Sequence, residues 1–139
     1  MKIQSLRSPR ELVGGMVHFG RMLDKIRLHA AGKLPADYHA SLGKGFDGYA
    51  CQFLCIEYPN LVARVATGGI DDEILAWCYL HGHKPGVFET GMFNDHLSKR
   101  GWRDVASAKF TERKAEAGLT DRNDVQTFFD LIDVDEERL

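Results

Sequence analysis

The sequence predicts an all-α protein, a compact single-domain bundle of about six or seven helices with one long glycine-rich loop. Apolar residues recur at spacings of three and four along most of the chain, which is typical of helices with one buried face. Residues that start and end helices flank these segments, and the alternating pattern of strands is almost absent. A length of 139 residues with 44% apolar content suits one core. We therefore predict a single helical domain over residues 1–139.

The first helix is predicted over residues 9–31. Its start, Ser8-Pro9-Arg10-Glu11, is a capping box with proline at the first helical position. Gly32 follows where a left-handed C-cap is expected. Gly14 and Gly15 lie early in this helix, where such a pair indicates close approach by another backbone or a ligand. The apolar face of the helix consists of Leu12, Met16, Phe19, Leu23, Ile26 and Ala30.

A turn-rich loop over residues 33–48 separates this helix from six others, which are predicted from their caps and their periodicity. The next five helices are expected over residues 47–56, 59–67, 71–81, 85–99 and 104–118. The last helix is expected to start at Thr120 or Asp121. Its apolar face is the clearest of all, with i, i+3, i+4, i+7 spacing: Val125, Phe128, Phe129 and Ile132.

Composition excludes several classes of protein. The formal net charge is −2, and a basic excess is usual in proteins that coat nucleic acid, so the composition argues against nucleic acid as a partner. The longest stretch without charge, residues 74–83, is half of the ~20 residues that a membrane helix needs. The first residues contain no apolar signal core, and three cysteines are typical of a reducing compartment. We expect a cytoplasmic protein with no membrane contact.

A polar stripe on the first helix contains the first candidate site residues. His18, Arg21 and Lys25 fall within roughly 60° of one another around the helix axis, with Asp24 on the flank. Val17, Met22 and Leu28 also lie off the main apolar face, so the helix is expected to be covered on more than one side. Buried charges must pair with one another or contact a ligand. Two interpretations are open: structural ion pairs, or a pocket in which Arg21 and Lys25 bind an anion and His18 transfers a proton.

The loop before the second helix is the densest polar loop in the chain, with Tyr38, Lys44 and Asp47 as further candidates. Its segment Gly43-Lys44-Gly45-Phe46-Asp47-Gly48 matches GxGxxG, but no strand precedes it, so a dinucleotide site is not indicated. Backbone amides entering a helix N-terminus could bind an anion. The alternative is an ordinary glycine-rich turn capped by Asp47.

Cysteine and histidine positions allow a weak case for zinc. Cys51, Cys55, Cys78 and His81 supply four soft ligands. Both pairs lie on predicted helices among large apolar residues, where cysteine usually acts as a small buried hydrophobe. We therefore predict no metal site and no cofactor.

The two ends of the chain carry opposite charge. Residues 1–45 hold eight Lys/Arg and three Asp/Glu, whereas residues 119–139 hold two Arg and seven Asp/Glu. The simplest explanation is that the ends pack against each other, within one chain or across a dimer. A basic ligand-binding face with a solvated acidic tail is the alternative.

Several motifs along the chain support a family resemblance. They are Leu6-Arg7-Ser8-Pro9-Arg10-Glu11, Gly14-Gly15, His18, Arg21, Asp24-Lys25-Ile26-Arg27, Gly32-Lys33-Leu34-Pro35, Tyr38, Leu42-Gly43-Lys44-Gly45-Phe46-Asp47, Trp77, Lys99-Arg100-Gly101-Trp102-Arg103-Asp104, Thr127-Phe128-Phe129-Asp130 and Asp133-Val134-Asp135-Glu136. With these motifs nearly the whole chain resembles an uncharacterised bacterial family of small proteins, the domain of unknown function DUF5069. The resemblance supports the helical fold and implies no activity.

Two functional hypotheses follow from these observations. In the first, the protein binds a small anionic molecule in a polar pocket between the first helix and residues 38–48. The ligand-binding residues would be His18, Arg21, Asp24, Lys25, Tyr38, Lys44 and Asp47, and His18 is the best catalytic candidate if there is turnover. In the second, the protein is an interaction or assembly module without catalytic activity, which includes the possibility of a homo-oligomer.

Overall fold

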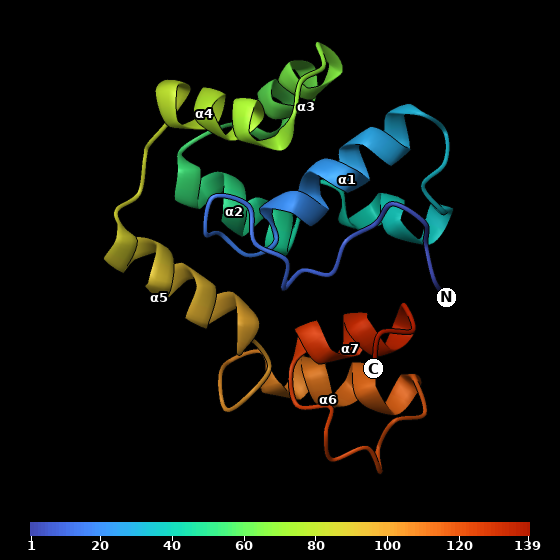
Figure 1. The fold of residues 1–139 in the computed structure, drawn as a ribbon. Coiled ribbons are helices and arrows are strands. Elements are labelled where there is room, and N and C mark those ends of the chain that lie inside the picture. Colours follow the sequence, from blue (N-terminus) through green and yellow to red (C-terminus); the bar gives the residue numbers. More distant parts are fainter.

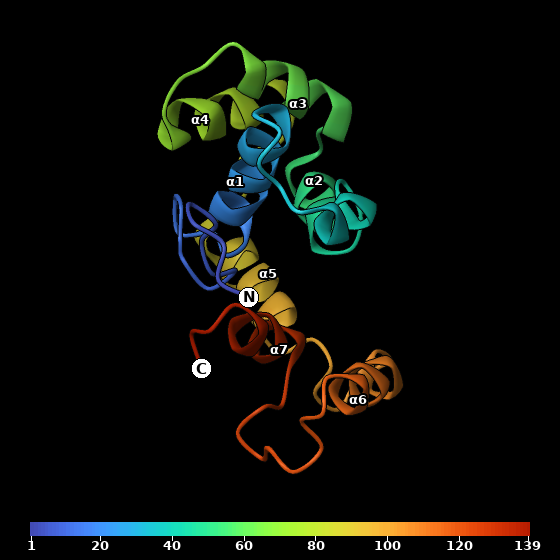
Figure 2. The same cartoon turned by 90° about the vertical axis from the view of Figure 1, so that its right-hand side faces the viewer.

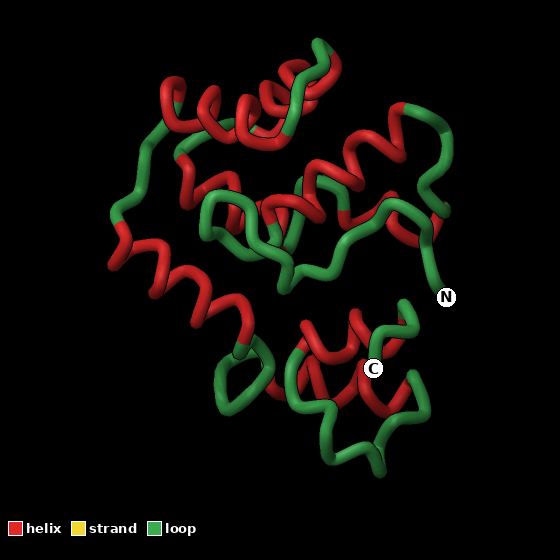
Figure 3. The backbone as a smooth tube through the Cα atoms, in the orientation of Figure 1, coloured by secondary structure: helices red, strands yellow, loops and turns green.

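Helices account for all the regular structure of the protein, as predicted (Figures 1 and 3). The computed structural model describes residues 1–139. Seven α-helices and one 3-10 helix follow one another along the chain. They are α1 (Phe19–Ala30), η1 (Ala36–Ser41), α2 (Phe46–Leu54), α3 (Tyr58–Ala66), α4 (Asp71–His81), α5 (Val87–Ser98), α6 (Ser107–Glu116) and α7 (Phe128–Asp135). None of these helices combines the length and the apolar character that crossing a bilayer requires.

Helix α1 is the central element of the fold. Figure 1 shows it between α3 and α4 on one side and the N-terminal segment on the other. Each residue from Phe19 to Ile26 is buried, which confirms that the helix is covered on more than one side. Its apolar side chains form one core with α2, α3, α4 and α5, and Phe129 of α7 joins the same core.

The predicted start of the first helix was wrong by ten residues. The chain from Pro9 to Val17 makes turns, and α1 begins only at Phe19. The backbone of Gly14 and Gly15 is left-handed, with φ of +58° and +76°, which a right-handed helix does not allow. Their turn pairs Val13 with Met16 in a short antiparallel bridge. The glycine pair therefore marks a tight turn, and Leu75 leaves no room for a Cβ at Gly14.

The last helix also begins later than predicted. Residues 119–126 form turns, and α7 starts at Phe128. A reciprocal cap fixes this start, because the Asp130 amide donates to Thr127 Oγ1 while the Thr127 amide donates to the Asp130 carboxylate. The sequence Thr-x-x-Asp at 127–130 is the signal for this cap. The apolar periodicity extended the prediction through Val125, which is buried but lies in a turn.

Helix α5 connects two parts of the molecule. It runs from the end of α4 to the part that holds α6 and α7, and Figure 2 shows α6 at the far end of the molecule from α3 and α4. Phe93 of α5 stacks on Phe53 of α2, with ring centroids 4.3 Å apart. Helix α5 also contacts α7. This path brings the C-terminal residues back toward the N-terminus (Figures 1 and 2).

Candidate functional site

His18, Lys25 and Asp47 meet in a buried cluster between α1 and α2. The His18 Nε2 atom lies 2.7 Å from Asp47 Oδ1, and the Lys25 ammonium lies 2.9 Å from Asp47 Oδ2. The amide of Gly43 donates to the same Oδ2 at 3.0 Å. All three residues are at most 5% exposed. The amide of Gly43, in the predicted glycine-rich loop, is therefore satisfied by Asp47.

The backbone of His18 turns its ring toward α2. This residue is left-handed, with φ of +68°, and its amide donates to the carbonyl of Pro9 at 2.8 Å. A left-handed histidine costs about 1–3 kcal/mol, which the surrounding structure must offset. The sharp change of direction lets the turn of residues 9–17 end where α1 begins.

Burial determines the protonation of this cluster. Desolvation lowers the pKa of His18, and the nearby charges of Lys25 and Arg21 lower it further against the attraction of Asp47. A neutral ring therefore donates from Nε2 to Asp47, and Nδ1 has no hydrogen-bond partner. Burial alone raises the pKa of Asp47, but the hydrogen bond from His18 and the charge of Lys25 outweigh it, so the pKa is lowered.

Arg21 and Tyr38 meet at a residue that the sequence analysis did not select, Glu136. Both terminal nitrogens of Arg21 donate to Glu136, each at 2.7 Å, in a two-pronged ion pair. The Tyr38 hydroxyl donates to Glu136 Oε2 at 2.8 Å, and Arg138 donates to Oε1 at 2.7 Å. Desolvation opposes the charge of Glu136, yet the hydrogen bond and charge of Arg21 lower its pKa. Glu136 is ionised at neutral pH and is only 2% exposed.

Asp24 lies on the flank of this arrangement and holds the N-terminal segment. It accepts from the amide and Nε of Arg7, both at 2.9 Å, and from Nη2 at 3.0 Å. Arg7 also contacts Asp71 at 2.7 Å, and Asp71 accepts from Arg27 at the same distance. Burial raises the pKa of Asp71, but the hydrogen bonds and charges of these two guanidinium groups outweigh burial, so the pKa is lowered. The ion pairs thus join the N-terminal segment to α1 and α4.

Lys44 does not join the other predicted site residues. Its side chain is exposed and makes no ion pair. The structure therefore places six of the seven candidates in three groups: His18, Lys25 and Asp47 together, Arg21 and Tyr38 on Glu136, and Asp24 on Arg7. Whether any of these residues binds a ligand stays a prediction.

The residues missed by sequence reasoning come from the two ends of the chain. Their signal was the opposite charge of the ends, and the structure confirms that the ends pair within one chain. Arg10 forms ion pairs with Asp130 and Asp133, and the Ser8 hydroxyl donates to Asp133 at 3.2 Å. The amide of Lys2 donates to Glu137 at 2.8 Å. We refer to the pairs of Arg7, Arg10, Arg21 and Arg138 with Asp24, Asp130, Asp133 and Glu136 as the terminal network.

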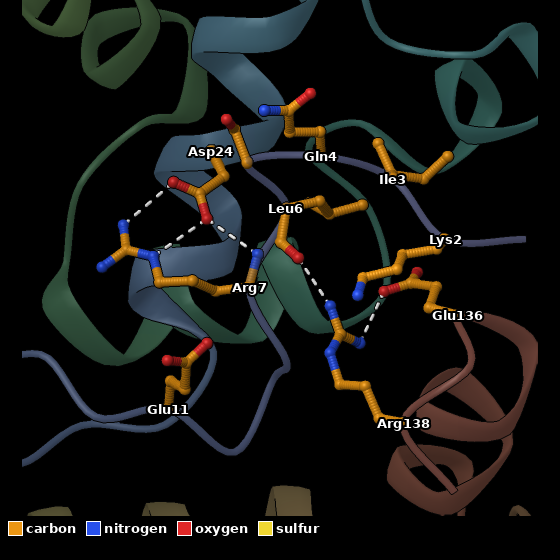
Figure 4. Close-up of a pocket in the computed structure, with 10 residues that line it drawn as sticks. Lys2, Ile3, Gln4, Leu6, Arg7, Glu11, Asp24, Glu136 and Arg138 are labelled. Atoms are coloured by element: carbon orange, nitrogen blue, oxygen red, sulfur yellow. Dashed lines mark hydrogen bonds and ion pairs between the residues drawn. The ribbon is translucent and has the colours of Figure 1, made fainter.

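A cavity of about 500 Å³ lies beside the terminal network (Figure 4). The N-terminal segment, α1 and the C-terminal residues form its walls. In the view of Figure 4, the charged side chains of Lys2 and Glu11 lie on opposite sides of Leu6. Eight of its ten lining residues are polar or charged. The lining residues are Lys2, Ile3, Gln4, Ser5, Leu6, Arg7, Glu11, Asp24, Glu136 and Arg138.

The cysteines are placed as separate side chains. Cys51 and Cys78 are buried in the core, whereas Cys55 is exposed. Burial raises the pKa of the Cys51 and Cys78 thiols to about 12, so both are protonated. No three of the His, Cys, Asp and Glu side chains are grouped as metal ligands would be.

The fold and the site define a small all-helical domain in which buried ion pairs hold both ends of the chain against one central helix. The chain belongs to the family described as domain of unknown function DUF5069, whose model matches residues 3–138. The resemblance found in the sequence motifs is thereby confirmed. No curated protein matches the chain.

Proposed function

We propose that this protein binds a small anionic molecule in the cavity between its N-terminal segment, α1 and its C-terminal residues. The observation that carries the proposal is the pair of charged groups on the walls, Lys2 and Glu11, neither of which forms an ion pair. The cavity of about 500 Å³ has the size of a pocket for a small molecule. Charged groups that have no ion-pair partner in the protein are available to a ligand.

The charges of the other wall residues are already balanced. Asp24 is neutralised by Arg7, and Glu136 by Arg21 and Arg138. The Lys2 ammonium is therefore the group that favours an anion, because a compact ammonium can bind a carboxylate or phosphate as a point charge. Glu11 accepts one hydrogen bond, from the amide of Ser8, and has capacity for another donor. The ligand that fits has an anionic group at one end and a donor, such as an amine, at the other.

A site between α1 and residues 38–48 is the second candidate location. His18, Lys25 and Asp47 would have to exchange their buried partners for the ligand, and breaking such a pair costs about 3–5 kcal/mol. Of the predicted residues in that loop, Lys44 alone could bind a ligand without first giving up a partner within the protein, because its side chain is exposed and makes no ion pair. The proposal assigns binding and no reaction, because His18, the candidate proton carrier, is only 2% exposed.

Native mass spectrometry of freshly purified protein tests the proposal. We expect a mass excess in the intact protein that disappears on denaturation and whose size identifies the bound molecule. Lys2→Glu should remove the excess, because it reverses the charge that attracts the anion. Lys44→Glu is the matched control and should retain it. An excess that depends on Lys44 and not on Lys2 would place the ligand at the loop and contradict the proposed cavity.

A further inference from the structure

A second cavity, of about 640 Å³, lies between α3, α4 and the end of α2. It is larger than the cavity beside the terminal network, and the two cavities share no lining residue. Helices α3 and α4 are neighbours in the fold (Figure 1). The amide of His83 donates to the carbonyl of Leu54 at 2.8 Å, which holds the end of α4 against the end of α2. Backbone contacts therefore fix the walls of this cavity relative to one another, and its volume suits a small molecule.

One wall of this cavity carries a pair of stacked rings. Trp77 and His81 are four residues apart on α4, and both line the cavity. Their ring centroids lie 4.7 Å apart, with an angle of 26° between the ring planes. Because a carbonyl oxygen only accepts, Nδ1 of His81 carries a proton and donates to the carbonyl of Trp77 at 3.0 Å, which holds the imidazole ring in place. A fixed pair of rings is a surface on which a planar molecule can stack.

The other long wall is a polar stripe of α3. Its residues follow one another at spacings of three and four, which places them on one side of the helix: Glu57, Asn60, Arg64 and Thr67. Nη1 of Arg64 donates to Thr67 Oγ1 at 2.9 Å and to the carbonyl of Gly68 at 2.6 Å. The guanidinium contacts no carboxylate, and its Nε and Nη2 atoms donate no hydrogen bond within the chain. These free donors can bind a carboxylate or a phosphate.

The charges along α3 give the cavity a direction. Glu57 precedes Arg64 by seven residues, so the two side chains lie about two turns, or ~10 Å, apart along the helix. His81 lies toward the Glu57 end, because the next residue, Gly82, packs against the carbonyl oxygen of Cys55. The carboxylate of Glu57 disfavours an anion at that end, whereas Arg64 favours one at the other. A ligand is therefore oriented with its ring toward His81 and its negative charge toward Arg64.

We propose that this cavity binds a planar aromatic anion, with its ring on the Trp77 and His81 pair and its anionic group on Arg64. Stacking selects a flat ring, and the guanidinium selects the negative charge. Aromatic carboxylates and nucleotides share this chemistry. The site is independent of the proposed function, because a ligand bound here meets neither Lys2 nor Glu11.

NMR of the ¹⁵N-labelled full chain tests this inference, because its two tryptophans give separate indole N–H signals. The probes are indole-3-acetate, an aromatic carboxylate, and adenosine 5′-monophosphate, a nucleotide. We expect at least one probe to shift the Trp77 signal saturably, and the tighter of the two identifies the source of the ligand. The signal of Trp102, on the exposed loop between α5 and α6, is the internal control and should not move. Cyclohexanecarboxylate and inorganic phosphate lack the aromatic ring and should leave Trp77 unshifted.

Two variants separate the two contacts of the ligand. Arg64→Gln removes the positive charge and His81→Leu removes one of the stacked rings, and each should weaken binding of the probe about fivefold or more. Lys2→Glu, which changes the charge of the other cavity, is the matched control and should leave the affinity unchanged. Alkylation with iodoacetamide checks the fold of each variant, because Cys55 is the only exposed cysteine. Reaction at Cys55 alone shows that the core is intact.

Three results would overturn the inference. The first is a Trp77 signal that neither aromatic probe shifts, or a shift of Trp102 in its place. The second is an equal shift of Trp77 by the anions that lack a ring. The third is an unchanged affinity in both Arg64→Gln and His81→Leu.

Discussion

At the scale of single residues, the polar stripe of α1 is explained by pairing. The sequence left open whether Arg21 and Lys25 pair with other side chains or bind a ligand. In the structure each has a buried carboxylate, Glu136 for Arg21 and Asp47 for Lys25. Asp47 could be selected from the sequence, since it lies in the loop that precedes α2. Glu136 could not, because no local pattern relates it to a helix more than one hundred residues away.

Removing one partner of the Arg21–Glu136 pair should strongly destabilise the fold. Arg21→Met removes the guanidinium that offsets the buried negative charge of Glu136. We therefore expect the free energy of unfolding to fall by about 3–5 kcal/mol. The double variant Arg21→Met/Glu136→Met should lose less than the sum of the two single variants. Urea denaturation of the four proteins measures this coupling. Additive effects would show that the pair contributes no interaction energy.

Protonation of His18 should make the fold less stable in mild acid. Burial lowers the pKa of this ring below its ordinary 6.5, so the unfolded chain takes up a proton where the folded chain does not. The contribution of His18 to stability is therefore complete above pH 6.5 and is lost as the pH falls, by up to about 1.4 kcal/mol per pH unit, until the folded ring also titrates.

His18→Gln isolates this contribution. A glutamine amide can still donate to Asp47 but does not titrate. The difference in unfolding free energy between pH 7 and pH 5 should be smaller in the variant than in the wild type. Equal differences in the variant and the wild type would mean that His18 titrates alike in the folded and unfolded states.

At the scale of elements, local caps and periodicity predicted most helices, and the errors have physical causes. The second to sixth helices were expected close to where they lie. The first helix was predicted to start too early, because its capping box and apolar repeat were given more weight than the cost of two glycines in a helix. In fact the Ser8 amide does donate to Glu11, but the left-handed Gly14 and Gly15 turn the chain before a helix can form.

Substitution of Gly15 distinguishes the observed left-handed turn from the predicted helix by the sign of its effect on the free energy of unfolding. Its φ is +76° and no atom lies near the position of a Cβ, so only the backbone opposes an alanine. Gly15→Ala should lower the free energy of unfolding by about 1 kcal/mol. In a helix the same change would raise it by a similar amount. Gly91→Ala, within α5, is the control and should raise the free energy of unfolding. Thermal or urea unfolding measures both variants.

At the scale of the whole molecule, the ends of the chain close around α1. The opposite charges of the two ends indicated this packing but did not distinguish contacts within one chain from contacts across a dimer. The cavity beside the terminal network could not be predicted, because its walls come from residues 2–7, Glu136 and Arg138 as well as α1. Sequence periodicity describes one helix at a time and does not locate spaces between segments that are distant in the chain.

The central claim, an anion site in this cavity, is tested most directly by NMR titration of ¹⁵N-labelled protein with inorganic phosphate. We predict saturable shifts confined to the amides of residues 2–7, Glu11, Asp24 and the C-terminal residues 136–138 (Figure 4). Lys2→Glu should weaken binding about fivefold or more, equivalent to roughly 1 kcal/mol, and Lys44→Glu should not. Shifts that do not saturate, or that follow Lys44 instead of Lys2, would contradict the claim.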